Sequence, residues 1–232
     1  VGDGKAYDKR VLERMRKHFH EDEVAGVCGL QVVPHDRDKN PVEWFRPCSE
    51  PLPKKFVFAN ANSFNALPPC QKLQAASWDN VIAMYRTHVL RDKIPFRKVT
   101  YGEDPLWATE ALQSGHALIY DPSCRVYHYH LEDTEVTYKR SITMHFLRHR
   151  LFQLQPQPAG STTRHFLSYA KSLFLNDDLT IKEKFHWMQF TMKNRRAMQC
   201  ARVDFCLALK QGNDAIEKLH QKCTGKTFKI AA

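Results

Sequence analysis

The sequence has no long apolar run and no closely spaced pair of cysteines. None of its apolar stretches reaches the roughly 18 residues that a transmembrane helix needs, so no membrane span is predicted. Its seven cysteines are scattered and form no Cys-x-x-Cys pair, which argues against a zinc ribbon and against a disulfide framework. We therefore expect a cytoplasmic protein with reduced thiols, and its 232 residues are enough to bury a core.

Acidic residues are scarce in the last hundred positions. Residues 136–232 contain 17 Lys and Arg against 6 Asp and Glu, a net charge of +11. Residues 1–135 contain 18 against 19, a net charge of −1. A basic block of this size predicts an anionic partner, which could be a phospholipid surface, a nucleic acid or a molecule that carries a pyrophosphate.

The pattern of apolar residues divides the chain at the same place. Residues 1–135 alternate predicted helices and strands, including a helix over 77–93 that begins at Ser77 and two short strands within 116–130. This alternation is typical of an α/β layer. From residue 138 only helices are predicted, three or four of them, with breaks at QPQPAGST, NDD and QGND. We expect an α/β domain over 1–135 and a basic helical region over 136–232.

Two carboxylates, Glu103 and Asp104, stand directly before a predicted helix, with proline at the next position. A carboxylate there can cap the helix, because it accepts hydrogen bonds from free backbone N–H groups and favours the positive end of the helix dipole. The same placement holds a carboxylate rigidly enough to serve as a general base. Position alone leaves both interpretations open.

Two histidines, His128 and His130, end the last predicted strand of this part. Side chains two residues apart on a strand share one face, so the two imidazoles could hold a metal ion. An exposed or hydrogen-bonded strand end is the simpler interpretation, and the pair by itself does not decide between them.

The order of these motifs resembles one enzyme family. An amide-rich turn in FANANSFNAL is followed by IPFRKVTYGEDPLWATEALQSGHALIYDPSCRVYHYH, and VGDGKAYDKRVLERM stands at the head of the chain. Together they resemble the later half of an inverting family 2 glycosyltransferase with the GT-A fold, closest to rhamnosyltransferase-like members. The resemblance covers residues 1–135. It implies a partial GT-A mixed sheet with flanking helices, and a chain that lacks most of the nucleotide-binding half.

The resemblance also implies roles for particular residues. Asp104 matches the catalytic base, with Glu103 as its acidic neighbour. Asp3 and His128 match the metal and diphosphate ligands, although Val1 stands where the first acid of the metal motif would fall. His130 is a further candidate at the metal. The remaining matches are to acceptor-binding residues: Asn60, Asn62, Ser63 and Trp107.

In this family a sugar moves from a nucleoside-diphosphate donor to a hydroxyl of a saccharide or lipid-linked acceptor, with inversion at the anomeric carbon. The acceptor hydroxyl loses a proton to a carboxylate, and Mn²⁺ or Mg²⁺ neutralises the charge that develops on the leaving diphosphate. The resemblance therefore implies a transferase of surface polysaccharide synthesis with a divalent metal as cofactor.

The basic region is expected to hold the protein on the inner, anionic face of a cell membrane as a peripheral protein. The basic residues expected there are Arg148, Arg150, Arg164, Lys171, Lys193, Arg195 and Arg196, with Phe152, Phe174 and Trp187 as apolar contacts. A helical region that only supports the sheet is the alternative.

Three other functions are less well supported by the sequence. A nucleic-acid-binding protein would explain the basic helices, but no RNA-binding or helix-turn-helix signature is present and we expect no nucleic-acid partner. A metal-dependent hydrolase using Asp104, His128 and His130 would lack the usual His-Glu-x-x-His spacing. An inactive glycosyltransferase remnant is the third alternative.

Overall fold

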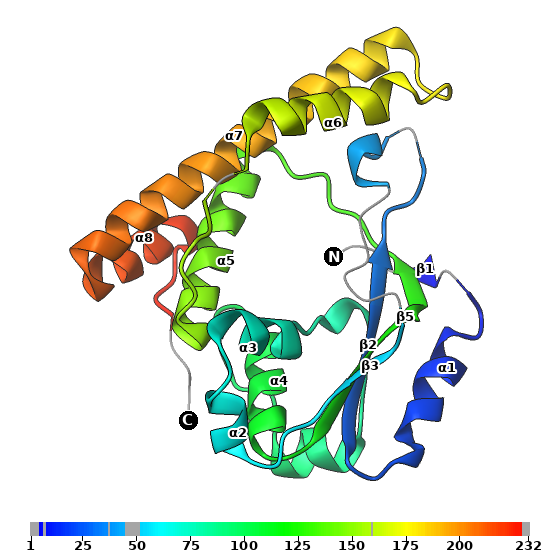
Figure 1. The fold of residues 1–232 in the computed structure, drawn as a ribbon, viewed down its shortest axis with the longest axis vertical. Helices are drawn as coiled ribbons and strands as arrows, with labels where there is room; N and C mark the ends of the chain where they lie inside the picture. The colour runs from blue at the N-terminus through cyan, green and yellow to red at the C-terminus, as the bar shows by residue number, and fades with distance from the viewer. Residues whose placement is uncertain (1–4, 7, 37, 45–51, 159, 229–232) are drawn as a thin grey trace.

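A mixed α/β layer is followed by a group of long helices in the computed structural model, which describes residues 5–6, 8–36, 38–44, 52–158 and 160–228 (Figure 1). The α/β class predicted from the sequence is confirmed. The expected metal ligand Asp3 lies outside the described residues.

The sheet has five strands: β1 (Lys5–Ala6), β2 (Val24–Val32), β3 (Lys54–Phe56), β4 (Ala83–Tyr85) and β5 (Ala117–Tyr127). The long strand β5 is its centre. It runs parallel to β2 on one side and pairs antiparallel with β1 and β3 on the other. The outer edge of β2 pairs antiparallel with β4, so the sheet is mixed.

Helices cover both faces of the sheet. α1 (Val11–Lys17) lies on one face, while α3 (Pro69–Ala76) and α4 (Glu103–Gln113) lie on the other (Figure 1). Successive residues of β5 follow the strand period of two, because Ala117 and Ile119 pack with α1 whereas Leu118 packs with α4. The sheet is therefore buried between two apolar layers.

The helix predicted over residues 77–93 is wrong. Ser77 instead ends α3, where its hydroxyl donates to the carbonyl of Leu73 at 2.7 Å. A short 3-10 turn, Asn80–Ile82, leads into β4, and a π-helical turn follows at Val89–Lys93. The reason is tertiary, since the free edge of β2 offers a hydrogen-bonding ladder that a helix at β4 could not use.

The two short strands predicted within residues 116–130 form one continuous strand with a bulge. The pairing of β5 with β2 shifts from Cys28 opposite Tyr120 to Leu30 opposite Arg125. The additional residues bend out of the ladder at Asp121, whose carboxylate accepts a hydrogen bond from the N–H of Ser123 at 2.9 Å.

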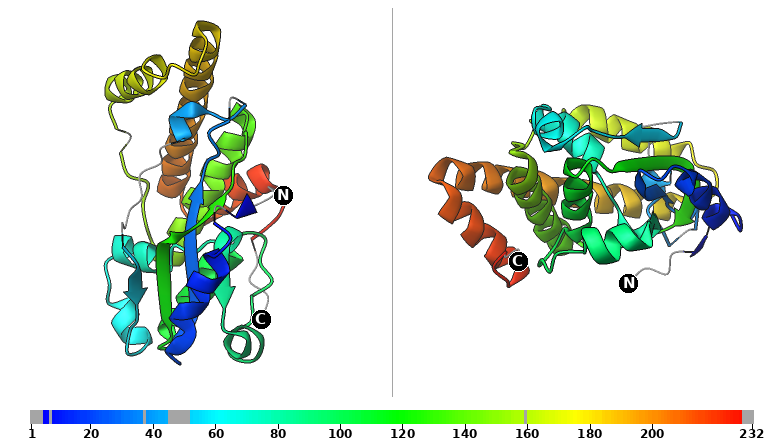
Figure 2. Two further views of the ribbon diagram at one scale, coloured as in Figure 1. Left: turned by 90° about the vertical axis from the view of Figure 1, so that its right-hand side faces the viewer. Right: turned by 90° about the horizontal axis from the view of Figure 1, so that it is seen from below.

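Among the described residues four helices follow the sheet, where three or four were predicted: α5 (Thr134–Phe152), α6 (Thr162–Phe174), α7 (Ile181–Gln211) and α8 (Asn213–Thr224). They break at the three predicted segments, and Figure 2 shows α6 and the start of α7 rising beyond the α/β layer. α7 begins at a capping box, in which Thr180 and Glu183 exchange side-chain and backbone hydrogen bonds.

α5 joins the two parts of the chain. Its residues Ile142 and Phe146 are buried against α7 and α8, whereas Phe152 at its end lies in the core beside α3 and α4. The cores of the α/β layer and of the helical region therefore share α5, which crosses the predicted division near residue 136.

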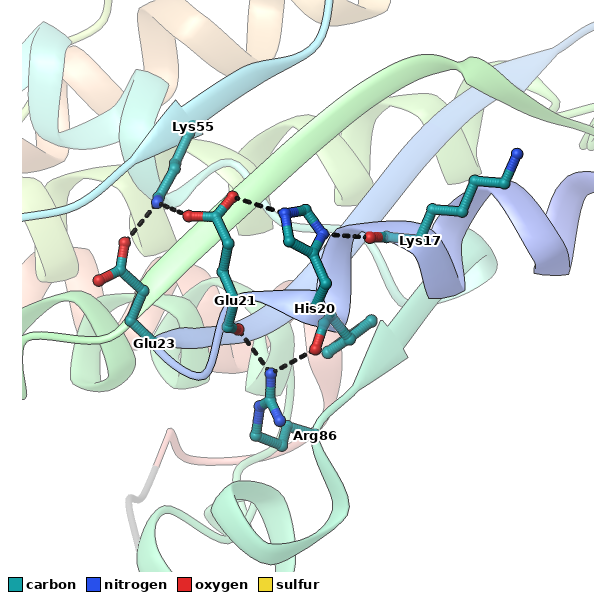
Figure 3. A network of polar contacts seen from close by, with 7 residues as sticks. Lys17, His20, Glu21, Glu23, Lys55 and Arg86 are labelled. Carbon is teal, nitrogen blue, oxygen red and sulfur yellow. Dashed lines mark hydrogen bonds and ion pairs between the residues drawn. The ribbon is translucent and has the colours of Figure 1, made fainter.

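A polar network fixes the turn that enters β2 (Figure 3). The guanidinium of Arg86 donates to the carbonyls of Phe19, Glu21 and Val24 at 3.0, 2.6 and 2.8 Å. Lys55 of β3 forms ion pairs with Glu21 and Glu23. The hydrogen bond from Lys55 to Glu21 is the main cause that lowers the pKa of Glu21. The network ties β3, β4 and the start of β2 together.

The described residues also bear on the expectations for the cysteines and for a membrane span. The six cysteines that the structure describes are free thiols. Among the described helices, none combines the length and the apolar character needed to cross a bilayer.

Candidate functional site

Asp104 lies in the first turn of α4 and not at its cap. The helix begins at Glu103 after Gly102, which occupies the left-handed region with φ of 84° and supplies no side-chain cap. The carboxylate of Asp104 therefore stands at the second helical position, half-buried, near the positive end of the helix dipole. Its neighbour Glu103 is exposed.

Burial is the main cause that raises the pKa of Asp104 to about 6, and the nearby carboxylates of Glu103 and Asp79 contribute to this rise. Hydrogen bonds from backbone N–H groups, including that of Asn80, oppose the rise. A carboxyl group with a pKa close to neutrality can both lose and regain a proton near pH 7, which is what general-base catalysis requires.

Polar side chains from three segments surround this carboxylate. Asp79 accepts a hydrogen bond from the amide of Gln31, which projects from β2. The hydroxyl of Tyr85 accepts from the indole N–H of Trp78 at 2.8 Å and donates to Asn80. Burial raises the pKa of Tyr85, so this phenol stays protonated and acts as a donor.

The two histidines are in contact just beyond the end of β5. Their ring centroids are 4.4 Å apart and the rings are nearly perpendicular. The backbone N–H of His128 donates to the carbonyl of Val32 at 2.9 Å, which continues the pairing with β2 by one residue. His128 is half-buried and His130 is exposed.

Three adjoining hollows lie between the sheet and the helices. The acid hollow, about 480 Å³, is lined by Asp79 and by Pro105, the residue after Asp104. The histidine hollow, about 400 Å³, is lined by both histidines. The third, about 490 Å³, lies between α5 and α7 and is named the arginine hollow after the residues Arg140, Arg148, Arg195 and Arg202.

Shared residues connect the three hollows. Gln31 lines both the acid and the histidine hollow, Arg148 lines both the acid and the arginine hollow, and Arg140 lines all three. The surface formed by these neighbouring hollows includes Pro105, the residue after Asp104, and both histidines, although Pro105 and His128 are 23 residues apart in the sequence.

Trp107 does not reach this surface. Its side chain is 1% exposed, its indole N–H donates to the carbonyl of Ile94 at 2.8 Å, and its ring packs against Trp78, Tyr85 and Phe96. The face of α4 that carries Trp107 is turned toward the sheet, so any role of Trp107 at an acceptor would be through packing and stays a prediction.

The amide-rich turn lies at the opposite end of α4 from Asp104. Asn60 caps the short helix α2 (Ala61–Asn65), and Asn65 of α2 accepts a hydrogen bond at 2.9 Å from Gln113, the last residue of α4. At about 1.5 Å per residue, the nine residue steps from Asp104 to Gln113 separate this end of α4 from Asp104 by about 14 Å.

None of the three expected acceptor residues in this turn lines the acid, histidine or arginine hollow. Instead, the carboxamide oxygen of Asn60 accepts from the N–H of Ser63 at 3.0 Å and from its hydroxyl at 3.2 Å. Asn62 is exposed. The turn stabilises its own helix, and the expectation that it faces the same site as Asp104 is not met.

This assignment gives the first prediction. Asn60→Ala is expected to lower the free energy of unfolding by about 1 kcal/mol, because an N-cap oxygen is lost. Chemical denaturation measures the change. The matched control is Asn62→Ala, which removes an exposed amide from the same helix and should change stability by less than about 0.5 kcal/mol. An equal loss in both variants would contradict the capping role.

The residues described here do not complete a metal site. Within the described ranges, no three or more His, Cys, Asp or Glu side chains gather closely enough to hold a metal ion. His128 and His130 would supply two imidazoles, and the third expected ligand, Asp3, lies outside these ranges. The prediction of Mn²⁺ or Mg²⁺ at Asp3 and His128 therefore stays a prediction.

Sequence reasoning missed two groups of residues at this surface. Asp79 was placed inside a helix that does not exist, so its contact with Gln31 was not expected. Arg140 and Arg202 were not singled out at all, and Arg148 and Arg195 were expected on an outer, lipid-facing surface. A signal existed for α7, where Arg195 and Arg202 are seven residues apart and must share a helix face.

Comparisons with known proteins add no relative: no family model, no curated protein and no solved structure matches this chain.

Proposed function

We propose that this protein transfers a sugar from a nucleoside-diphosphate donor to an acceptor hydroxyl with inversion, and that Asp104 is the general base. The observation that carries this proposal is the half-buried carboxylate of Asp104, with a pKa of about 6, at the start of a helix beside the acid hollow. The motif order from Asn60 to His130 supplies the reaction class.

The reaction needs one general base and one site that stabilises the negative charge of the leaving nucleoside diphosphate. The acceptor oxygen attacks the anomeric carbon, its proton passes to a carboxylate, and the bond to the nucleoside diphosphate breaks on the opposite side. At pH 7 a carboxyl group with a pKa of about 6 is about nine-tenths ionised, so Asp104 is ready to accept that proton.

Positive charge next to the acid hollow suits the departing diphosphate. Arg140 and Arg148 both line this hollow, together with Asp79 and Pro105. Fixed cations near a leaving phosphate stabilise the charge that develops on it without any reorganisation. An in-line displacement needs a base for the acceptor and cations for the departing group, and residues of both kinds lie at or next to this hollow.

The fold proposed for residues 1–135 is a part of the GT-A fold. The mixed sheet, with parallel β2 and β5 at its centre and antiparallel strands at its edges, is compatible with it. The position of both histidines just beyond the end of β5 also supports this proposal.

Direct assay tests the proposed reaction. The full-length gene product is incubated with a panel of nucleoside-diphosphate sugars and with lipid-linked and soluble saccharide acceptors, and the release of nucleoside diphosphate is measured. We expect one donor to be consumed and the glycosidic bond of the product to have the opposite anomeric configuration. Retention of configuration would contradict the proposal, because a single displacement inverts.

We also propose that α6 and the start of α7 bind an anionic membrane surface. Leu173 of α6 is buried, but the outer face of α6 carries exposed apolar side chains. This apolar face continues onto α7, because the rings of Phe174 and Phe185 are in contact with their centroids 5.6 Å apart. The apolar patch consists of Phe166, Leu167, Phe174, Leu175, Ile181 and Phe185, each 41–71% exposed.

Basic residues border this apolar patch. Arg164 and Lys171 lie on α6, and Lys182 and Lys184 lie on α7. Exposed apolar side chains beside lysines and arginines favour the interface of a bilayer that contains anionic lipids, where each basic residue contributes about 1 kcal/mol. Phe152 and Trp187, which the sequence suggested as lipid contacts, are 3% and 5% exposed and therefore belong to the core.

Co-sedimentation with vesicles tests the membrane proposal. Phe185→Glu should reduce binding to vesicles of phosphatidylcholine and phosphatidylglycerol at least tenfold, because a charge would replace an inserted ring. The control is Leu207→Glu, at a residue 50% exposed on the same helix but outside the apolar patch, which should bind normally. Wild-type binding should need the anionic lipid and weaken as salt rises to about 0.5 M. Equal losses in both variants would reject the patch as the contact.

A further inference from the structure

The arginine hollow contains two arginines, Arg195 and Arg202, that do not line the acid hollow and that the proposed transfer reaction does not explain. Ser141, His145 and Arg148 follow helical spacing along α5, and Arg195, Gln199 and Arg202 follow it along α7, so the two helices present facing polar stripes. The hollow between them has a volume of about 490 Å³, which is large enough for a ligand much bigger than a water molecule.

Three of its guanidinium groups have no acidic partner. Among the described residues, neither Arg148, Arg195 nor Arg202 forms an ion pair, and the buried Nε of each has no hydrogen-bond acceptor. Arg195 does donate through Nη2 to the carbonyl of Gly160 at 2.9 Å, which fixes the direction of its side chain. Buried N–H groups of charged side chains are costly to leave unpaired, so their convergence indicates a site for an anion.

The carboxylate among the described lining residues of the hollow is already paired. Glu132 lines the hollow, but it forms an ion pair with Arg140. This pair neutralises one of the four arginines and leaves the charge of the other three uncompensated within the described part of the hollow.

His145 reports the same positive environment. Burial lowers its pKa to about 4, and the charges of Arg148 and Arg202 contribute to the shift. The imidazole is therefore neutral at pH 7, where it can donate a hydrogen bond to an anion without adding to the repulsion among the arginines.

Apolar groups complete the lining. Met144 of α5 and Met198 of α7 face the hollow, and the side chain of Met198 is 54% exposed. Flexible thioether side chains adapt to irregular apolar surfaces, so the hollow combines a charged side with an apolar one.

We propose that the arginine hollow binds the diphosphate group of a ligand whose remaining part is apolar or aromatic, through Arg148, Arg195 and Arg202. Three guanidinium groups balance the two to three negative charges of a diphosphate ester, and their forked N–H groups match phosphate oxygens in pairs. Met144 and Met198 contact the part of the ligand attached to the diphosphate. A lipid diphosphate and a nucleoside diphosphate share this chemistry.

This inference does not depend on the proposed transfer reaction. It concerns residues on α5 and α7 and is tested by binding alone, so a protein without transferase activity could still bind a diphosphate here. If transfer does occur, the shared lining of Arg140 and Arg148 places the bound diphosphate next to the acid hollow.

Calorimetric titration of the protein with inorganic pyrophosphate is the first test. We expect Arg148→Gln and Arg202→Gln each to weaken binding by about tenfold to a hundredfold, because each removes hydrogen bonds between two charged groups. The matched controls are Arg150→Gln on α5 and Arg196→Gln on α7, which remove the same charge from exposed positions that do not line the hollow. They should bind as the wild type does.

Thermal unfolding separates a binding role from a structural one. Pyrophosphate should raise the unfolding temperature of the wild type and of both controls, but not that of Arg148→Gln or Arg202→Gln. Without pyrophosphate, the two variants should be at least as stable as the wild type, because each removes one of three mutually repelling charges. A clear loss of stability in both would mean that the arginines support the fold, and would overturn the proposal.

Two further ligands identify the source of the diphosphate. Tighter binding of geranyl diphosphate than of pyrophosphate would support a lipid diphosphate, and tighter binding of uridine diphosphate would support a nucleotide. Equal affinity for all three would overturn the apolar part of the proposal. No binding of pyrophosphate at low salt, or equal weakening by the hollow and control variants, would overturn it entirely.

Discussion

Asp104→Asn is expected to slow sugar transfer by about two to four orders of magnitude, because a positioned general base contributes that much to the rate. Asparagine keeps the size and the hydrogen-bond acceptor of the side chain but cannot take up a proton. The measurement is the turnover number of the full-length gene product at saturating donor and acceptor. Glu103→Gln is the control, since this neighbouring carboxylate is exposed and should matter only a few-fold.

The pH dependence of the same variant distinguishes a base from a structural residue. Burial holds the pKa of Asp104 at about 6, so wild-type turnover should fall as the pH drops below about 6, where the carboxylate becomes protonated. The residual activity of Asp104→Asn should lack this step. Near-normal transfer by the variant, or an unchanged acid limb, would contradict the assignment.

The raised pKa of Asp104 also predicts a stability effect with a definite sign. An acid whose pKa is higher in the folded state stabilises the fold below its unfolded pKa, near 4, and this contribution is lost as the pH rises through about 6. Asp104→Asn should therefore be more stable than the wild type at pH 7, and the difference should shrink toward pH 4. A gain in stability together with a loss of turnover is the signature of a site that sacrifices stability for activity.

Gly102→Ala is expected to lower the free energy of unfolding by about 2–5 kcal/mol, the largest stability effect that we predict for a single methyl group. Gly102 has φ of +84°, and a Cβ atom there would stand 2.5 Å from Cδ2 of Leu147 on α5. The variant therefore combines backbone strain with a clash between α5 and the start of α4. Urea denaturation with an unchanged m-value measures the loss.

Gly115→Ala is the matched control for this effect. Gly115 has nearly the same φ, +81°, but its nearest contact would be the carbonyl oxygen of Ala59 at 3.6 Å. It should lose only the backbone part, about 1–2 kcal/mol. In a Leu147→Ala background, Gly102→Ala should also cost less, because the clash is gone. Equal losses at the two glycines would show that only the backbone angle matters and that α5 does not press against Gly102.

The sequence alone determined the helical half of the protein. Each of the breaks between α5, α6, α7 and α8 is marked by local chemistry that needs no partner: Pro-rich and Gly-containing segments, the capping box of Thr180 and Glu183, and Gly212 with its positive φ. Short-range signals of this kind are complete in the sequence. The same holds for Asn60, whose cap to Ser63 spans three residues.

Long-range pairing decided the segment after Ser77. Residues 83–85 form β4 because they pair with the edge of β2. The β2 residues that they pair with, 26–28, are more than 50 positions away, so a local stretch of sequence does not include both partners. Ser77 and Asp79 carry the residue types of helix caps, and they do cap, but Ser77 closes the helix before it and Asp79 opens only a 3-10 turn. Residue type indicated a boundary there without indicating on which side the helix lies.

The candidate site is divided in the same way. The family resemblance singled out Asp104, whose place before a helix left two interpretations open, but its pKa depends on burial, on Glu103 and on Asp79, which comes from another segment. Arg148 and Arg195 were recognised as members of a basic block, but whether a charge faces lipid, water or another arginine is set by the packing of α5 against α7. Sequence spacing determines which side chains share a helix face, and only the tertiary structure determines what that face meets.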